Sequence, residues 1–342
     1  MKTIVCLLLT ALVLLPGCGR KVRLGDSAEL PPATGSVLEI VAVVDSSLYS
    51  ERIRSALHNA LSPITGERLQ KERRAKLYVI PRWNFSRTYR TTRYLVLVEK
   101  ADSTASLTLT KDLYATPQCV FRIKAPDESA AAEQINSSGA YIWQSIRQSA
   151  IDALQERFSR IPNTRLKAVS ALGIDISVPN YYHVARSEKD FVWLTMDLAK
   201  HGVKGSANIL LYRLDSATVA SAGQNAVELR DTIARRYVPG ETEGSYMQTE
   251  RQAVRPGSEK AVLNDTPAVF TYGYWRVEGD YMGGPFLNYT IVDPTDGTAY
   301  CADGFVYLPS EEKDAYMLEL EAILRTFRLA QKPAGKKAIK TL

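Results

Sequence analysis

The sequence predicts an α+β protein of two domains, each a mainly antiparallel sheet with packed helices. Two observations lead to this prediction. First, short apolar runs of strand length alternate with longer segments whose apolar residues recur at three- and four-residue steps. Second, this alternation of strand-like and helix-like segments occurs in both halves of the chain. We place an N-terminal domain at residues 36–161 and a C-terminal domain at residues 166–328.

The first domain opens with a strand expected over residues 37–44. A helix is expected over residues 48–61, because Ile53, Leu57 and Leu61 follow one another at four-residue steps. A long helix closes the domain, with Asp127 as its N-cap and its end before Pro162. The remaining strands are expected at residues 77–81, 94–98, 106–109 and 120–123, and the apolar side of the long helix carries Ile135, Ile142, Ile146 and Leu154.

The second domain continues in the same style. A helix is expected over residues 225–237, where apolar residues alternate with polar ones such as Arg230 and Asp231, and Ser310 is expected to cap a final helix. The strands are expected at residues 174–178, 191–196, 208–212, 268–278, 286–292 and 298–307. This order resembles the sheet-and-helix sandwich of the photosystem oxygen-evolving P protein.

The first 17 residues have the features of a signal peptide. Lys2 supplies a positive charge, and the 12 residues 4–15 form an apolar run, shorter than the about 20 residues that span a bilayer. The run ends in Leu15-Pro16-Gly17-Cys18, which resembles the bacterial lipobox, so Cys18 is the expected lipidation site. An ordinary secretory signal with a chance cysteine is the alternative. Residues 18–35 have no hydrophobic period and are expected to form a tether, and residues 329–342 a basic tail.

Several runs carry a resemblance to a known family. The most specific are residues 238–247, 275–286, 304–307 and 316–324, and residues 87–98 and 191–194 share it more loosely. Over about residues 35–328 the chain resembles a family of exported Bacteroidetes lipoproteins known only as a domain of unknown function. The resemblance implies a lipid-anchored envelope protein, and it brings no activity, cofactor or catalytic residue. In such bacteria acidic residues after the cysteine accompany surface display, so Arg20, Lys21 and Arg23 favour a periplasm-facing position on the outer membrane.

Two cysteines remain after processing. Cys6 leaves with the signal peptide and Cys18 takes lipid, whereas Cys119 and Cys301 each stand in a strand-like run. An exported protein can form disulfides, yet small buried cysteines are also common core residues. The sequence leaves open whether these two are bridged.

The motifs of common enzymes do not occur in the chain. It has no Walker loop, no dinucleotide-binding glycine pattern and no nucleophile elbow. Its three histidines stand far apart, and although Asp293, Asp296 and Asp303 could be imagined as calcium ligands, Asp293-Pro-Thr-Asp-Gly297 has the composition of a turn, which we favour over a metal site. Glu278 and Asp280 form a carboxylate pair with no identifiable third participant. We therefore expect no metal and no cofactor, and catalysis is not favoured.

A basic and aromatic segment is the first candidate binding surface. Residues 68–93 hold nine Lys and Arg residues against the single acid Glu72. Within them, Arg82, Arg87, Arg90 and Arg93 are interleaved with Trp83, Phe85, Tyr89 and Tyr94. In the cytosol this mixture would suggest nucleic acid, but outside the cytosol the expected anions are lipid headgroups, glycans and acidic protein surfaces. The alternative is that the aromatic residues are core and the arginines simply solvated.

The link over residues 279–285 is the second candidate. Its seven residues are more than a tight hairpin needs, and Tyr281 and Met282 stand at the expected tip. Exposed side chains of this kind suggest a lip for a partner or a ligand, unless the loop folds back and buries them.

The leading hypothesis is thus a non-catalytic, membrane-anchored protein-interaction module of the cell envelope. A carrier or sensor of a small ligand or a glycan is the alternative and predicts a deep apolar pocket with a few polar groups. A hydrolase is third and predicts carboxylates with shifted pKa values in a cleft. The sequence identifies neither the partner nor the oligomeric state.

Overall fold

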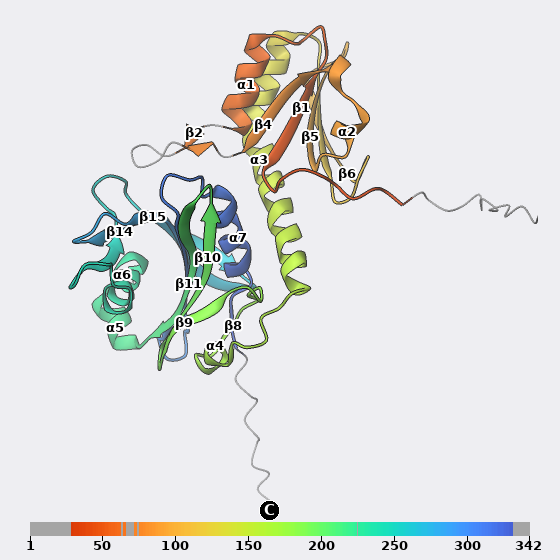
Figure 1. Ribbon diagram of the computed structural model, residues 1–342. Coiled ribbons are helices and arrows are strands. Elements are labelled where there is room, and N and C mark those ends of the chain that lie inside the picture. The colour runs from red at the N-terminus through yellow and green to blue at the C-terminus, as the bar shows by residue number, and fades with distance from the viewer. Residues whose placement is uncertain (1–28, 63, 66–71, 74, 224, 331–342) are drawn as a thin grey trace, which may run out of the picture.

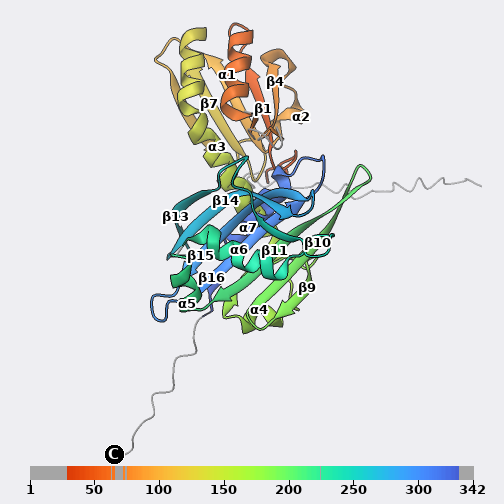
Figure 2. The ribbon, with the colours of Figure 1, turned by 90° about the vertical axis from the view of Figure 1, so that its left-hand side faces the viewer.

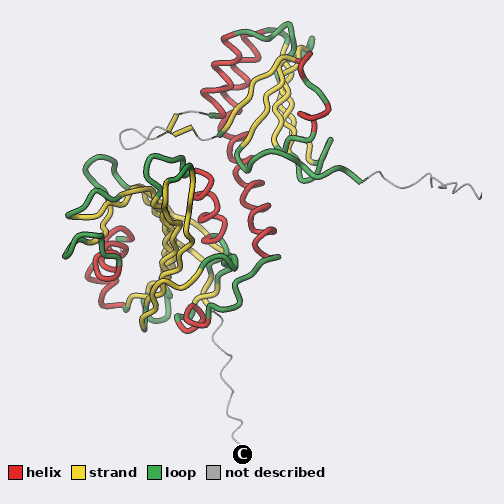
Figure 3. Tube along the Cα trace, in the orientation of Figure 1, coloured by secondary structure: helices red, strands yellow, loops and turns green. Residues whose placement is uncertain are grey.

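The computed structural model describes residues 29–62, 64–65, 72–73, 75–223 and 225–330 (Figure 1). The predicted signal peptide, Cys18, most of the predicted tether and the tail beyond residue 330 lie outside the described residues. Within the described part, two separate sheets each carry helices, so the protein is an α+β protein of two domains (Figure 3).

The first sheet is mainly parallel, so the prediction of a mainly antiparallel sheet was wrong for this domain. Its strands are β1 (Glu39–Val44), β4 (Lys76–Pro81), β5 (Tyr94–Lys100), β6 (Ser106–Lys111) and β7 (Cys119–Ala125), in the order β4-β1-β5-β7-β6. Strand β1 pairs in parallel with β4 and β5, β5 pairs in parallel with β7, and β6 pairs antiparallel with β7. The physical reason is the helical connection between β1 and β4, which returns the chain to the end of the sheet where β1 began.

Helices cover the two faces of the first sheet unequally. Helices α1 (Glu51–Leu61) and α3 (Glu128–Ser159) lie on one face, and the short η1 (Arg82–Asn84) and α2 (Arg87–Arg90) lie on the other (Figure 1). The predicted cap of the long helix is confirmed, because the Asp127 carboxylate accepts the Ala130 N–H at 2.9 Å. The four apolar residues predicted to line this helix are all buried.

The second sheet has eight antiparallel strands and curls into a half-barrel (Figures 1 and 3). The strand order is β12-β14-β15-β16-β11-β10-β9, and β13 also pairs with β14. The bounds are β9 (His183–Glu188), β10 (Phe191–Lys200), β11 (Val203–Leu214), β12 (Tyr246–Thr249), β13 (Gly257–Leu263), β14 (Thr266–Glu278), β15 (Gly283–Val292) and β16 (Ala299–Tyr307). Here the predicted antiparallel sheet is confirmed. The finer resemblance to the photosystem protein stays a prediction.

Two tight turns account for strands that the sequence analysis missed or shortened. His201 and Gly202 have φ values of 49° and 83° between β10 and β11, and Asn264 and Asp265 have φ values of 48° and 63° between β13 and β14. Two successive residues with positive φ are the signature of the hairpin turn whose twist matches that of its strands. The strands around these turns are rich in polar residues, so the apolar pattern did not reveal their full length.

Successive side chains of the second sheet enter two different cores. Helix α6 (Ala226–Tyr237) covers one face, where it meets residues such as Tyr212 and Cys301. Helix α7 (Asp314–Leu324) and part of α3 cover the other face, where they meet residues such as Leu211 and Ala302 (Figure 2). Because successive side chains of a strand point to opposite faces of the sheet, the apolar residues on each face can pack against a different helix.

The last part of the chain differs from the prediction in two ways. Ser310 has a φ of 59° and stands before the helix, which begins at Asp314 with Lys313 at the N-cap, so Ser310 is not the cap. Residue 329, the first of the predicted tail, is a strand residue, because β17 (Arg328–Leu329) pairs with β8 (Ile174–Asp175). The remaining short elements are β2 (Ile64–Thr65), β3 (Glu72–Arg73), α4 (Lys167–Ala171) and α5 (Ser216–Ser221).

Candidate functional site

A cleft lies where helix α3 leaves the first sheet and passes the second domain. The N-terminal part of α3 packs on α1 and β7, and its C-terminal part packs on α7 (Figure 1). Beside it lie two cavities of about 520 and 410 Å³, whose walls share Arg147, Glu259, Phe270 and Glu321. Because the walls are shared, the two cavities form one continuous cleft between the domains.

The larger cavity is mainly apolar and rich in aromatic rings. Its walls include Trp143 from α3, Phe270 and Tyr272 from β14, Leu287 from β15 and Met317 from α7. The Phe270 and Tyr272 rings are neighbours, with centroids 5.4 Å apart. Such a surface suits the hydrocarbon part of a ligand or the flat face of a ring.

The smaller cavity carries a buried carboxylate between two arginines. Glu321 on α7 is 2% exposed, and its Oε1 lies 2.7 Å from Nη2 of Arg325. Arg147 of α3 donates a hydrogen bond to the other carboxylate oxygen. Arg325 also donates to the side-chain oxygen of Gln148 at 2.9 Å. Two guanidinium groups contact this one carboxylate, and Glu259 also lines the cavity, so two arginines and two glutamates balance in formal charge.

The protonation states in the cleft suit binding better than proton transfer. Burial lowers the pKa of Arg325, but the charges of Glu321 and Tyr289 and the hydrogen bonds to them together outweigh burial, and the pKa rises. Burial raises the pKa of the Tyr289 phenol, and the Glu321 charge adds to this effect. Both groups therefore stay protonated at neutral pH and can donate hydrogen bonds to an anion. Neither has a pKa near neutrality, the value that general acid–base catalysis needs.

Two further properties bear on what the chain can hold. Among the described residues, no group of three or more His, Cys, Asp and Glu side chains is arranged to hold a metal ion. In the same part of the chain, no helix has the length and hydrophobicity to cross a bilayer.

Comparison with known families divides the chain at the end of α3. Residues 33–159 match the family described as Domain of unknown function (DUF8532), and residues 162–326 match Domain of unknown function (DUF4837). The chain carries two domains of unknown function. The cleft lies between them, with α3 supplied by the DUF8532 domain and β14, β15 and α7 by the DUF4837 domain. The family descriptions mention neither a lipid anchor nor a bacterial group.

Comparisons with individual proteins add only remote similarities. No curated protein matches the sequence. Three solved structures are similar over part of the chain. LpqN of Mycobacterium tuberculosis, described as involved in cell envelope biogenesis, is 16% identical with a TM-score of 0.28, covering 46% of this chain and 83% of LpqN. A Bacteroides thetaiotaomicron protein is 10% identical with a TM-score of 0.24, covering 47% of each chain. Human STARD10 is 8% identical with a TM-score of 0.22, covering 43% of this chain and 75% of STARD10.

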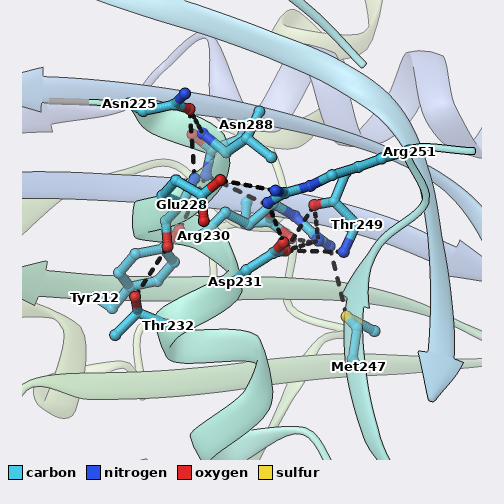
Figure 4. A network of polar contacts seen from close by, with 12 residues as sticks. Tyr212, Asn225, Glu228, Arg230, Asp231, Thr232, Met247, Thr249, Arg251 and Asn288 are labelled. Carbon is cyan, nitrogen blue, oxygen red and sulfur yellow. Dashed lines mark hydrogen bonds and ion pairs between the residues drawn. The ribbon is translucent and has the colours of Figure 1, made fainter. Parts of the chain in front are cut away.

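A second polar site lies inside the DUF4837 domain, beneath helix α6 (Figure 4). Arg230 of α6 is 1% exposed and donates from Nε to Oδ2 of the fully buried Asp303 on β16 at 2.7 Å. The Arg230 guanidinium carbon also lies 3.9 Å from the centroid of the Phe286 ring. Asn288 donates to the same Asp303 oxygen at 3.3 Å and to the Tyr212 hydroxyl at 3.2 Å. These groups satisfy one another, so the network fixes α6 on the sheet and leaves little for a ligand.

The pKa directions in this network follow from burial. Burial raises the pKa of Asp303, and the charge of Arg230 opposes this rise without cancelling it. Burial also holds the pKa of Tyr212 well above its usual value, with smaller contributions from Cys301 and Asp303. At the rim of the network, Arg251 donates to Asp231 at 2.7 Å and to Glu228 at 2.7 Å in more exposed surroundings.

The arginines singled out in the sequence lie in the DUF8532 domain, on the face of the first sheet opposite α1 and α3. Arg82, Arg87 and Arg90 are exposed, and Arg93 is half-buried. The Arg82 and Arg90 guanidinium carbons lie 5.6 and 5.7 Å from the centroid of the Phe85 ring. Trp83 is 67% exposed, whereas Tyr94 is fully buried. The aromatic residues of this segment therefore divide between two environments: Tyr94 and Phe85 pack in the core, and Trp83 remains at the surface.

The predicted loop at Tyr281 is shorter than expected. Strand β15 begins at Gly283, so only residues 279–282 connect it to β14, and Gly283 and Gly284 are strand residues rather than turn residues. Tyr281 is fully exposed, and Met282 is half-buried against the core beneath α6. Both line a cavity of about 350 Å³ together with Trp275.

Both cysteines of the described chain are free and buried. They lie in different sheets, Cys119 in β7 and Cys301 in β16. Burial raises the pKa of the Cys301 thiol to about 12.

The structure assigns roles to several residues that the sequence analysis passed over. Arg147, Glu321 and Arg325 received no role, because charged residues on a helix usually face solvent. Arg230 was read as part of a polar helix face and Asp303 received no role within its predicted strand, whereas both are buried. A faint signal was available at Asp303, because it interrupts an apolar strand at residues 299–307 and a charge in such a place needs a partner.

Proposed function

We propose that the protein is a cell-envelope lipoprotein, anchored through Cys18, that binds a small amphipathic ligand with an acidic group in the cleft between its two domains. The observation that carries the proposal is the pairing of an aromatic cavity with an adjoining cavity in which Arg147 and Arg325 both contact Glu321, with Glu259 also in the wall. The aromatic walls of this cleft support the small-ligand hypothesis.

The two ends of the cleft suit the two ends of such a ligand. An apolar body would displace water from Trp143, Phe270 and Met317, a contribution of about 25 cal/mol per Å² buried. A carboxylate or phosphate would complete the coordination of Arg147 and Arg325, because arginine binds these groups through paired N–H donors. Glycans that carry acidic groups could use the same rings and arginines.

The support for export and membrane anchoring comes from the sequence. The apolar run at residues 4–15 followed by Leu15-Pro16-Gly17-Cys18 supports export and lipid attachment, and the resemblance to exported Bacteroidetes lipoproteins points the same way. Mass spectrometry of the N-terminal peptide from cells tests this part of the proposal. An unmodified Cys18 would refute the anchor and leave the cleft to be tested separately.

The cleft is tested by binding of a fluorescent fatty acid, a dansyl-labelled undecanoic acid, to the purified protein. We expect saturable binding that weakens by about tenfold in Arg147→Met, because one charged hydrogen bond to the acid is lost. Trp143→Ala should also weaken binding. Arg251→Met is the matched control, since Arg251 is an ion-paired arginine of the second domain that does not line the cleft. Equal affinity in all four proteins would refute the proposal.

A protein-interaction module is the second candidate, and the exposure of Tyr281 favours it. A tyrosine that is fully exposed beside a half-buried methionine is the kind of side chain that anchors partner contacts. Crosslinking in intact cells should then recover a specific partner from wild type and not from Tyr281→Ala/Met282→Ala. Tyr141→Ala, at another exposed tyrosine, is the control. Recovery of the same partner from the double variant would refute this contact surface.

A further inference from the structure

We infer that the face of the first domain that carries α2 docks on an anionic lipid bilayer. This inference rests on the lipid anchor at Cys18 that forms part of the proposed function. We call this surface the basic face and define it by Tyr78, Arg82, Trp83, Arg87, Tyr89, Arg90 and Lys124. It is opposite the face covered by α1 and α3 (Figure 1).

The strand register explains why this side of the sheet is open to solvent. Tyr78 of β4 pairs with Val41 of β1, so both point to the same face, where only a small core forms with Phe85 and Tyr114. At the other edge, Lys124 of β7 pairs with Ser106 of β6, and both side chains are exposed. Among the described residues, two short helical turns cover the centre of this face and leave its edges exposed.

The composition of the basic face is that of a protein surface at the lipid headgroups. Trp83 is 67% exposed, Tyr78 51% and Tyr89 37%. Tryptophan and tyrosine are favoured at the membrane interface because their rings have an apolar body and a polar tip. The arginines and Lys124 add positive charge, which attracts anionic headgroups within about one Debye length. Glu99 is an acid on this side, and it is already paired with Arg82 and Arg122.

The N-terminal segment is fastened beside this face. The Thr34 N–H donates to the Thr91 carbonyl at 2.8 Å, and the Arg93 N–H donates to the Thr34 carbonyl at 3.0 Å. Residue 34 is thereby held directly after α2, the helix that carries Arg87 and Arg90. From Cys18 to Thr34 the chain makes 16 residue-to-residue steps, so it can span at most about 55 Å. A lipid on Cys18 would therefore keep the basic face close to the membrane.

The experiment attaches the protein to vesicles through Cys18 itself. The mature chain from Cys18 to Leu342, made without lipid, is coupled by this thiol to a maleimide lipid, since Cys119 and Cys301 are buried. Vesicles of phosphatidylethanolamine and phosphatidylglycerol are compared with neutral phosphatidylcholine vesicles. Lipids brominated on their acyl chains quench tryptophan fluorescence, and subtraction of the Trp83→Phe signal isolates Trp83. We expect Trp83 to be quenched in the anionic vesicles and not in the neutral ones.

A second measurement uses the unattached protein. Its partition onto anionic vesicles should fall by roughly fivefold for each arginine removed from the basic face. Arg87→Glu/Arg90→Glu should therefore bind much more weakly than wild type. Arg255→Glu/Lys204→Glu is the matched control, because both residues are exposed in the second domain.

Three results would overturn the inference. They are Trp83 quenching that is equal in neutral and anionic vesicles, no Trp83 quenching in anchored protein, and equal partition of the two double variants. The last would also direct attention to a protein partner for these arginines. Because the chemical coupling supplies the anchor, these results do not depend on whether cells acylate Cys18, which the mass of the native peptide decides, or on the ligand of the cleft.

Discussion

Arg230 and Asp303 form an ion pair in the interior of the second domain, with Nε and Oδ2 2.7 Å apart and both side chains almost fully buried. They are 73 residues apart in the sequence and join helix α6 to strand β16. Because Asn288 and Thr249 complete the hydrogen bonding, the pair is a satisfied structural unit.

Removal of one partner of this pair should be strongly destabilising. Arg230→Met leaves the Asp303 carboxylate buried and uncompensated, and we expect a loss of about 3–5 kcal/mol in the free energy of unfolding. Urea denaturation followed by circular dichroism measures it. Arg251→Met removes an exposed ion pair and should cost no more than about 1 kcal/mol. Equal losses in the two variants would contradict this account.

Glu250 should make the second domain sensitive to acid. The N–H of Ala253 donates to Glu250 Oε1 at 2.8 Å, and this bond, with others from the same turn, lowers the pKa of Glu250 below its ordinary value of 4.5. A lowered pKa stabilises the fold above the unfolded value, and the contribution is lost as the pH falls through the folded pKa. Glu250→Gln should therefore be less stable than wild type by about 1–2 kcal/mol at pH near 7. The difference should shrink as the pH falls below 4.5 towards the lowered pKa of Glu250, as urea midpoints will show.

The two buried thiols should be free and unreactive. In a Cys18→Ser form of the mature chain, Cys119 and Cys301 remain, and both are free. Burial, which raises the pKa of Cys301 to about 12, keeps this thiol protonated and shielded from reagents. We expect no reaction with a thiol reagent in the native protein and two thiols after denaturation without reductant. A count of zero after denaturation would reveal a disulfide.

The contact between α1 and α3 should make a helix-favouring substitution unfavourable. Gly139 lies in the middle of α3, where alanine normally adds about 1 kcal/mol of helix stability. A Cβ at this position would lie 2.8 Å from the Cβ of Ala60. We expect Gly139→Ala to lower the thermal midpoint, since overpacking costs about 1–3 kcal/mol. Ala60→Gly/Gly139→Ala should recover part of the loss, and a rise of the midpoint in the single variant would show that the helices separate at little cost.

The sequence by itself determined features that depend on local chemistry. Several local features could be predicted from the sequence, because each depends on residues close together in the chain. They are the cap at Asp127, the apolar stripe of α3, the turn after β15 and the strands β1, β5, β15 and β16. The second sheet was correctly expected to be antiparallel, since its long strands are joined by short turns.

Tertiary structure decided what depends on distant residues. Whether β1 pairs in parallel is set by how α1 returns the chain, and the apolar run of a buried strand does not encode that direction. The cleft arises because α3 extends past its own domain and places Arg147 beside Glu321, 174 residues later. The burial of Arg230 and Asp303 likewise depends on a partner across the fold. A charged side chain reads as a surface residue until the element that neutralises it is in place.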